Sequence, residues 1–179
     1  RKSPRIVQAN MDGSNKVTLL KDMQELPNGL AIDFERSGEI CFAGASPLIC
    51  KEANCSIFNY TSISCIPAGL KYPSAASQMT VVHRSQMGQP YALAAYGNFY
   101  FWTNWQTSKL YSIDRYTKEI RTYQSPIMNN SRMYGLSVMA SRCPDLQGAT
   151  SACAKERNYG GCTYLCVPEE SGGRKCICP

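Results

Sequence analysis

The segment that most constrains the fold is NFYFWTNWQTSKLYSIDRYT at residues 98–117, where aromatic residues crowd a short extended stretch. Tyr100 and Trp102 fall on one face of any strand, and Phe99 and Phe101 fall on the other. Both faces of this strand are therefore expected to be covered. This pattern predicts a strand that lies inside a stack of sheets.

Related segments recur along the chain. Three segments share a small residue followed by leucine and then an alternation of side-chain types: NGLAIDF at 28–34, YALAAYG at 91–97 and YGLSVMA at 134–140. Each of them predicts a short buried strand. The first two are followed by three further strand-like segments each, with turn residues between them. The repeating unit is thus four antiparallel strands over about 40 residues, which is the spacing of β-propeller blades.

The predicted fold class is all-β, a partial propeller of about two and a half blades over residues 1–142. Its units are half a blade at about 5–20, full blades at 28–67 and 91–124, and one more inner strand at 134–140. Residues 72–89 are predicted to be an inserted loop.

The chain has ten cysteines, none in the paired CxxC rhythm of a zinc ribbon, which favours disulfides in a secreted protein. If Ala45-Ser46 form a two-residue hairpin turn, Cys41 lies opposite Cys50, and Cys55 and Cys65 bracket the next hairpin. The register therefore predicts the disulfides Cys41–Cys50 and Cys55–Cys65. The alternative is that these are free buried thiols.

Other features also indicate an extracellular protein. Three N-x-S/T sequons predict glycosylation at Asn54, Asn59 and Asn129. No apolar run is long enough to cross a membrane. The net charge is +6, and residues 143–179 hold four basic and four acidic side chains, so the excess lies in the first part. This excess predicts either a solvated basic face or an attraction to acidic partners such as sulfated glycans.

The segment YFWTNW resembles the YWTD strand of the six-bladed propellers of the low-density-lipoprotein-receptor class. The resemblance places Phe101 and Trp102 between blades, makes Thr103 bond within its blade, and gives Asn104 the position that ties blades together. Asn104 stands where that family has aspartate, so it keeps hydrogen bonding without the charge.

Within that class, LPNGLAIDFERSGEICFAGA, AGLKYP and SRMYGLSVMASRCP resemble the C-terminal globule of the nidogen (entactin) family. Residues 143–179 resemble an EGF-like module, for which the family pairs Cys153 with Cys166 and Cys162 with Cys176. Cys178 has no sixth cysteine after it, so the module is expected to be truncated and the chain to be a fragment. Cys143 then pairs outside the chain or with Cys178. The module lacks the acidic cluster of calcium-binding EGF modules, so no metal is expected.

An enzyme is not expected. His83 is the only histidine, and it has no serine nucleophile motif or second imidazole near it in sequence. Glu169-Glu170 are adjacent loop residues rather than a pair held across a cleft. The aromatic residues have strand spacing, unlike a nucleic-acid-binding face, so neither a nucleic-acid partner nor a cofactor is predicted.

Binding remains as the predicted function. Loops that enter the inner strands and follow the second strands of a propeller converge at one end of its axis, and polar-tipped aromatic residues dominate interfaces. By position, these loops carry the predicted partner-binding residues Asn28, Lys71, Tyr72, Tyr91, Trp105, Gln106 and Tyr134. The alternative for Tyr91 and Tyr134 is simple packing between blades.

The nidogen resemblance implies the partner, an EGF-like module of the laminin γ chain with an acidic loop that suits Lys71 and Lys109. It also implies links to collagen IV, perlecan or heparan sulfate in basement membranes. The alternatives are an ectodomain fragment of a lipoprotein-receptor-like endocytic receptor and an architectural spacer.

Overall fold

The computed structural model describes residues 3–36, 38–45, 49–51, 54–56, 61–85, 88–124, 132–139, 152–153, 160–163, 165–168 and 172–177; at 49–51, 54–56, 165 and 177 the backbone alone is described. The chain divides into two compact units, one of residues 1–6 and 18–141 and one of residues 7–17 and 142–179. Within the described residues, helix is limited to α1 (Ser74–Ser77) and the 3-10 helix η1 (Phe34–Arg36). None of the described helices could span a membrane. The all-β prediction is therefore confirmed.

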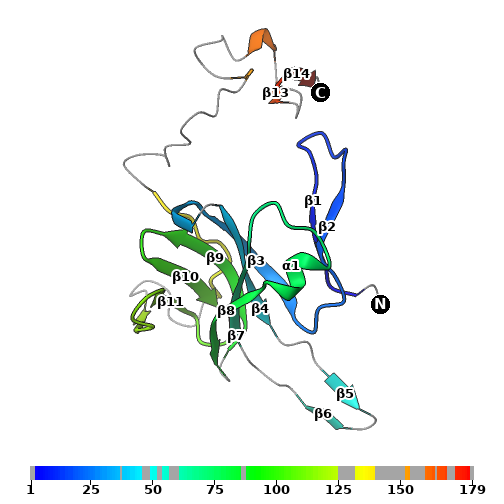
Figure 1. The fold of residues 1–179 in the computed structure, drawn as a ribbon. Coiled ribbons are helices and arrows are strands. Elements are labelled where there is room, and N and C mark those ends of the chain that lie inside the picture. Colours follow the sequence, from blue (N-terminus) through cyan, green and yellow to red (C-terminus); the bar gives the residue numbers. More distant parts are fainter. Residues whose placement is uncertain are drawn as a thin grey trace. The chain divides into compact units, whose positions relative to one another are not determined.

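One four-stranded antiparallel sheet matches the blade predicted at 91–124 strand for strand (Figure 1). It consists of β9 (Pro90–Tyr96), β10 (Phe99–Asn104), β11 (Lys109–Asp114) and β12 (Ile120–Tyr123), in this order across the sheet. The β9–β10 hairpin reverses at Gly97, whose φ of 54° suits glycine. Tyr100 and Trp102 are 0% and 3% exposed, whereas Phe99 and Phe101 are half-buried, so the two faces of β10 are covered unequally.

The other four-stranded sheet, the first blade, has an unexpected connection. It is ordered β3 (Leu26–Asp33), β4 (Glu39–Ala45), β7 (Thr61–Ile66) and β8 (Thr80–Ser85). The predicted hairpin turn at 45–46 is wrong, because β4 stays paired to its last residue, with Ala45 opposite Thr61 of β7. The sequence predicts the third strand of this blade at residues 48–53, but residues 49–51 form β5 (Ile49–Lys51), which pairs with β6 (Asn54–Ser56) in a separate two-stranded sheet.

This connection changes the disulfides. The predicted pairs Cys41–Cys50 and Cys55–Cys65 are wrong, since Cys41 is bonded to Cys65. The β4–β7 register places these two residues directly opposite each other, and both are fully buried. Cys50 lies opposite Cys55 in the backbone register of β5 and β6.

Residues 72–89, predicted to be an inserted loop, contain α1 and the outer strand β8. The first blade therefore extends to Ser85 rather than ending at residue 67. His83, predicted to lie in that loop, is on β8, and its ring centroid is 5.5 Å from that of Trp102 in the second blade. Burial, and secondarily the charge of Lys118, lowers the pKa of His83.

The inner strand predicted at 134–140 is not formed by residues 132–139. An inner strand is defined by its ladder to a second strand, and no described strand pairs with this segment. The predicted half-blade at about 5–20 contains the two-stranded sheet of β1 (Ile6–Gln8) and β2 (Val17–Leu20).

The C-terminal module is a disulfide-linked hairpin of β13 (Leu165–Pro168) and β14 (Arg174–Ile177). The disulfides Cys153–Cys166 and Cys162–Cys176 are confirmed. Gly160 is required beside them, because a Cβ there would lie 2.6 Å from the Cys166 sulfur. Asn59, Asn129, Cys143 and Cys178 lie outside the described residues, as does the side chain of Asn54.

The core of the larger unit lies where the two blades pack together. It joins one face of the first blade to one face of the second through the buried side chains Cys41, Ala43, Ile63 and Cys65, and Leu93, Tyr100, Trp102 and Ile113. The inner strands β3 and β9 approach so closely that a Cβ on Gly29 would lie 2.6 Å from the Leu93 nitrogen. This close approach brings the residues at both ends of β3 against the second blade.

Candidate functional site

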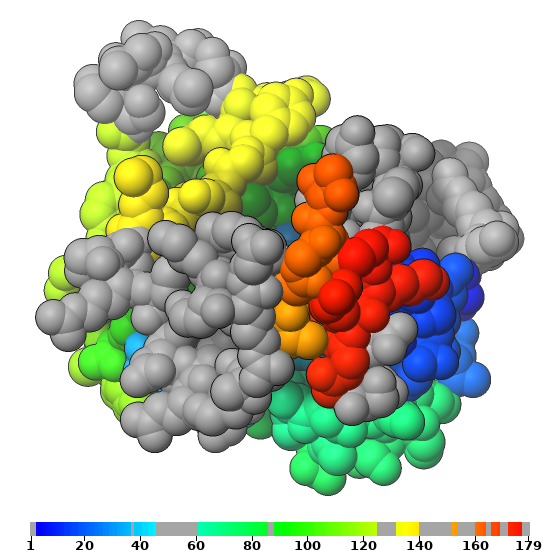
Figure 2. All heavy atoms as spheres, turned by 90° about the horizontal axis from the view of Figure 1, so that it is seen from above, coloured from blue at the N-terminus to red at the C-terminus, as the bar shows by residue number. Residues whose placement is uncertain are grey.

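Three aromatic rings and one cation gather at one end of the blade junction; we call them the junction cluster. Tyr91 at the start of β9 stacks on Trp105, which directly follows β10, with ring centroids 4.4 Å apart and planes 16° apart. Tyr134 meets both rings edge-on, at 5.6 and 5.3 Å. The Arg132 guanidinium lies 5.7 Å from the Trp105 ring centroid. Figure 2 shows the segment 132–139, in yellow, lying against the green surface of the preceding strands.

The backbone of Trp105 is held by a hydrogen bond, whereas its side-chain donor has no partner among the described residues. Its backbone N–H donates to the Gln89 carbonyl at 2.9 Å. Its indole Nε1–H is buried and has no hydrogen-bond partner among the residues that the structure describes. A buried donor without an acceptor costs free energy, which would be recovered only if neighbouring side chains moved to bring an acceptor to this N–H group. Tyr134 adds accessible aromatic area, since it is 54% exposed.

Asn28 links this cluster to the first blade. Its side-chain amide donates to the Pro90 carbonyl at 2.9 Å, directly before Tyr91. Gln106 follows Trp105, is exposed, and donates its backbone N–H to the Asn104 side chain at 2.9 Å. Five of the seven predicted partner-binding residues, Asn28, Tyr91, Trp105, Gln106 and Tyr134, thus lie at or beside the junction cluster.

Lys71 and Tyr72 have different neighbours. The Tyr72 backbone N–H donates to the Thr18 carbonyl at 3.2 Å, and the Lys21 ammonium lies 4.6 Å from the Tyr72 ring centroid. Among the described residues, no ring contact or hydrogen bond joins Lys71 or Tyr72 to the junction cluster. The seven predicted partner-binding residues therefore lie in two places, five at or beside the junction cluster and two, Lys71 and Tyr72, beside Thr18 and Lys21.

The YWTD-like residues hold the second blade in shape. Trp102 stacks on Tyr111 at 5.5 Å, and Thr103 accepts a hydrogen bond from the Ala92 N–H at 3.1 Å, within the blade. Phe101 is half-buried on the opposite face of β10.

Asn104 fastens the two turns of the blade that lie beside the junction cluster. Its Oδ1 accepts hydrogen bonds from the backbone N–H groups of Gln89, Gln106 and Thr107. A Cβ on Gly88 would collide with the Asn104 amide at 1.7 Å, so glycine is required there. Unlike the role implied by the family resemblance, these bonds remain within the second blade and the turn that enters it.

The opposite end of β3 carries a buried polar network that the sequence did not indicate. Asp33 pairs with Arg115 at 3.0 Å, and their side chains are 1% and 3% exposed. Tyr100 donates its hydroxyl to Asp33 at 2.6 Å, and Arg115 also donates to the Gly97 carbonyl at 2.6 Å. Burial, then the hydrogen bond to Asp33 and the charge of Asp33, raises the pKa of Tyr100 to about 12. The network joins the first blade to the second.

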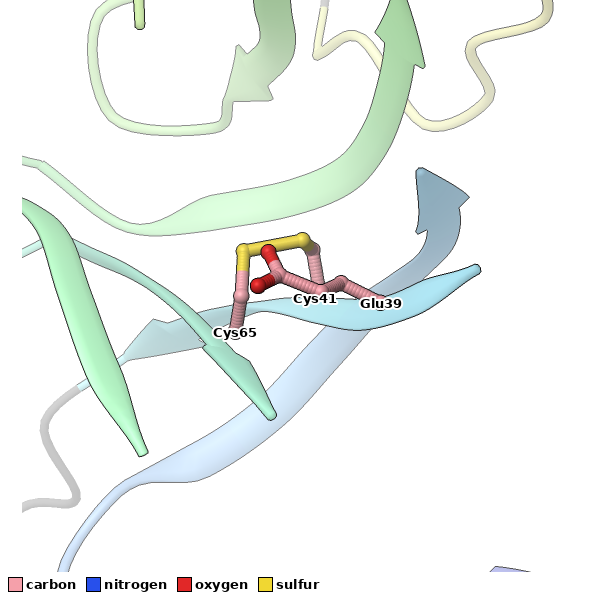
Figure 3. Close-up of side chains that lie close together, drawn as sticks. All are labelled: Glu39, Cys41 and Cys65. Atoms are coloured by element: carbon pink, nitrogen blue, oxygen red, sulfur yellow. A yellow bond between two sulfur atoms is a disulfide. The ribbon is translucent and has the colours of Figure 1, made fainter. Parts of the chain in front are cut away.

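One cluster has the residue types of a metal site. Glu39, Cys41 and Cys65 offer ligand atoms within 4.8 Å of one another, but Figure 3 shows the two sulfurs bonded to each other beside the carboxylate. A metal-binding cysteine is a thiolate, so this disulfide leaves the group one carboxylate and no sulfur ligand.

Two four-stranded antiparallel sheets packed face to face, followed by a disulfide-linked hairpin module, define a partial β-propeller with an EGF-like module. No protein-family model matches the chain. The chain is 31% identical to Nidogen of Drosophila melanogaster over 183 residues, which cover 99% of this chain and 12% of that protein. A solved structure, "Crystal structure of Nidogen/Laminin Complex", matches with a TM-score of 0.54 and 25% identity over 74% of this chain and 42% of that chain.

These matches identify the chain as a homologue of nidogen, and it spans about an eighth of the length of the Drosophila relative. A second kind of relative is the human Low-density lipoprotein receptor-related protein 4. It is 32% identical over 95 residues, which cover 53% of this chain and 5% of that protein.

Proposed function

We propose that this chain is part of an extracellular-matrix adaptor that binds laminin through the junction cluster. The observation that carries the proposal is Trp105, whose ring stacks on Tyr91 and lies beside the Arg132 cation and the 54% exposed Tyr134. The similar solved structure is described as a nidogen and laminin complex, which supports laminin as the partner.

The chemistry of the cluster defines the partner more finely. Tyr91, Trp105 and Tyr134 supply rigid aromatic area of the type that dominates interface energy. The Arg132 guanidinium favours a protruding loop with oxygen acceptors, and a carboxylate would pair with this cation. We propose an EGF-like module of the laminin γ chain as the source of this loop, with collagen IV and perlecan bound elsewhere in the full-length protein.

The proposed location is the basement membrane. Three disulfides in the described residues fit an oxidising extracellular compartment. The residues of the junction cluster are suited to contact rather than to reaction, so the proposed role is that of a non-enzymatic adaptor.

The test is capture of laminin γ short-arm fragments by the full-length protein on a biosensor surface. Trp105→Ala and Tyr134→Ala are expected to weaken capture by about 1–4 kcal/mol, the range of interface anchors. Tyr123→Ala is the matched control, because Tyr123 is 42% exposed on the outer strand β12. Capture that is unchanged in both cluster variants would rule out this surface.

The alternative is a fragment of an endocytic receptor of the lipoprotein-receptor class, supported by the match to receptor-related protein 4. The full-length sequence separates the two. A membrane span with cysteine-rich ligand-binding repeats would favour the receptor, and a protein without a span that captures laminin would favour the adaptor.

A further inference from the structure

Three chain segments that are far apart in sequence meet around Tyr72. The Tyr72 N–H donates to the Thr18 carbonyl at 3.2 Å, so the segment leading into α1 passes beside β2 (Figure 1). The Met23 N–H donates to the Pro4 carbonyl at 3.3 Å, which brings Arg5 alongside the segment that carries Lys21. Lys71 directly precedes Tyr72 on the third segment.

The resulting surface is positively charged. Arg5, Lys21 and Lys71 are all exposed, and none forms an ion pair with a described residue. Asp22 is the one acidic residue in these three segments, and it accepts a hydrogen bond from the Ser3 hydroxyl at 2.9 Å. The charge excess of the chain agrees with this placement, because residues 1–142 contain 15 basic and 9 acidic side chains, which accounts for the whole net charge of +6.

The geometry fits a polyanion better than a folded acidic protein. A protein interface favours an apolar centre, whereas the one large apolar side chain that is exposed in the described residues of these three segments is Tyr72, which is 41% exposed with the Lys21 ammonium 4.6 Å from its ring centroid. That cation–π contact restricts the Lys21 ammonium without neutralising it. Separate, exposed point charges suit a chain of repeated anionic groups, since each bound cation releases a condensed counterion.

We propose that Arg5, Lys21 and Lys71, arranged around Tyr72, form a binding surface for sulfated glycosaminoglycans. This assigns Lys71 and Tyr72 to a second surface with a different class of partner from that of the junction cluster.

The test uses the full-length secreted protein and immobilised heparin, with affinity measured as a function of NaCl concentration. Lys21→Gln combined with Lys71→Gln is expected to weaken binding about 10-fold or more at low salt and to lower the slope of log affinity against log salt by about 2, one for each lost contact. The matched control, Lys118→Asn with Arg121→Gln, changes two exposed cations of the second blade, has the same change in net charge and should stay within about 2-fold of the parent protein.

Two further measurements make the test independent of simple loss of charge. Asp22→Asn removes the local acid, and asparagine tolerates the positive φ of 54° at this position, so heparin binding should become tighter. Heparin stripped of its sulfates should bind weakly. The proposal is overturned if the double lysine variant keeps the parent slope, if the control loses as much affinity, or if desulfated heparin binds equally well. Loss of laminin capture with unchanged heparin binding would also overturn it, because the surface would then serve a protein partner.

Discussion

The buried pair of Asp33 and Arg115 gives the sharpest test of how the two blades are joined. Asp33→Asn preserves side-chain size but removes the charge that balances a guanidinium only 3% exposed. Removing one partner of a buried ion pair typically costs 3–5 kcal/mol, because the other charge is left desolvated. In this variant Arg115 keeps its hydrogen bond to the Gly97 carbonyl, and the asparagine oxygen can still accept a hydrogen bond from Tyr100. We therefore expect the free energy of unfolding to fall by about 3 kcal/mol, the lower end of that range.

The assay is urea unfolding of the chain followed by tryptophan fluorescence. The chain has two tryptophans, and Trp102 is buried at this same junction. Arg115→Met is expected to cost a similar amount, whereas Asp33→Asn with Arg115→Met should cost clearly less than the sum, because no isolated charge remains. A loss below about 1 kcal/mol for Asp33→Asn, or strict additivity in the double variant, would refute the view that this pair is desolvated and coupled.

Three further results are expected. Gly29→Ala should destabilise the chain by about 1–3 kcal/mol in the same assay, because its Cβ would collide with the backbone of β9 rather than with a movable side chain; a neutral effect would contradict the observed strand spacing. Because the pKa of Tyr100 is raised from 10.0 to about 12, its contribution to stability should be complete below pH 10 and lost as pH rises toward 12, and Tyr100→Phe should remove this dependence. Because the pKa of Asp12 is lowered from 3.8 to about 2, its contacts should stabilise the fold above pH 3.8 and be lost as pH falls toward 2. An NMR titration should show Ser14→Ala raising the pKa of Asp12 more than Lys175→Gln does, since the Ser14 side-chain hydrogen bond is its largest cause.

The second blade could be predicted from sequence because all of its information is local. Alternation identifies each strand, and short turns set the register, as at Gly97 between β9 and β10. The first blade could not be predicted in the same way. Its second and third strands, β4 and β7, are separated by residues 46–60, and no local pattern shows that a strand resumes pairing after such an interval. Assuming a tight turn at 45–46 paired Cys41 with the wrong cysteine.

The residues of the candidate site that lie at strand ends could be predicted from the sequence. Tyr91 and Trp105 flank a hairpin that the sequence defines, so their proximity follows from the blade register. The partnership of Asp33 with Arg115 spans 82 residues and depends on the packing of one blade against another, which periodicity does not encode. Arg132 lies just before the segment predicted to be a strand at 134–140, and its position over Trp105 depends on the path that this segment takes instead.

The junction cluster is a property of the two blades together rather than of either blade alone. Asn28 and Asp33 lie near opposite ends of β3, and each is bonded to the second blade, the first through Pro90 and the second through Arg115. Gly29 allows the inner strands to approach between these two points. Because the strands are fastened at both ends, a rotation of one blade against the other would stretch one attachment or the other. The position of Tyr91 relative to the first blade is therefore fixed by contacts at both ends of β3, and a separately folded second blade would present the same rings without Asn28 beside them.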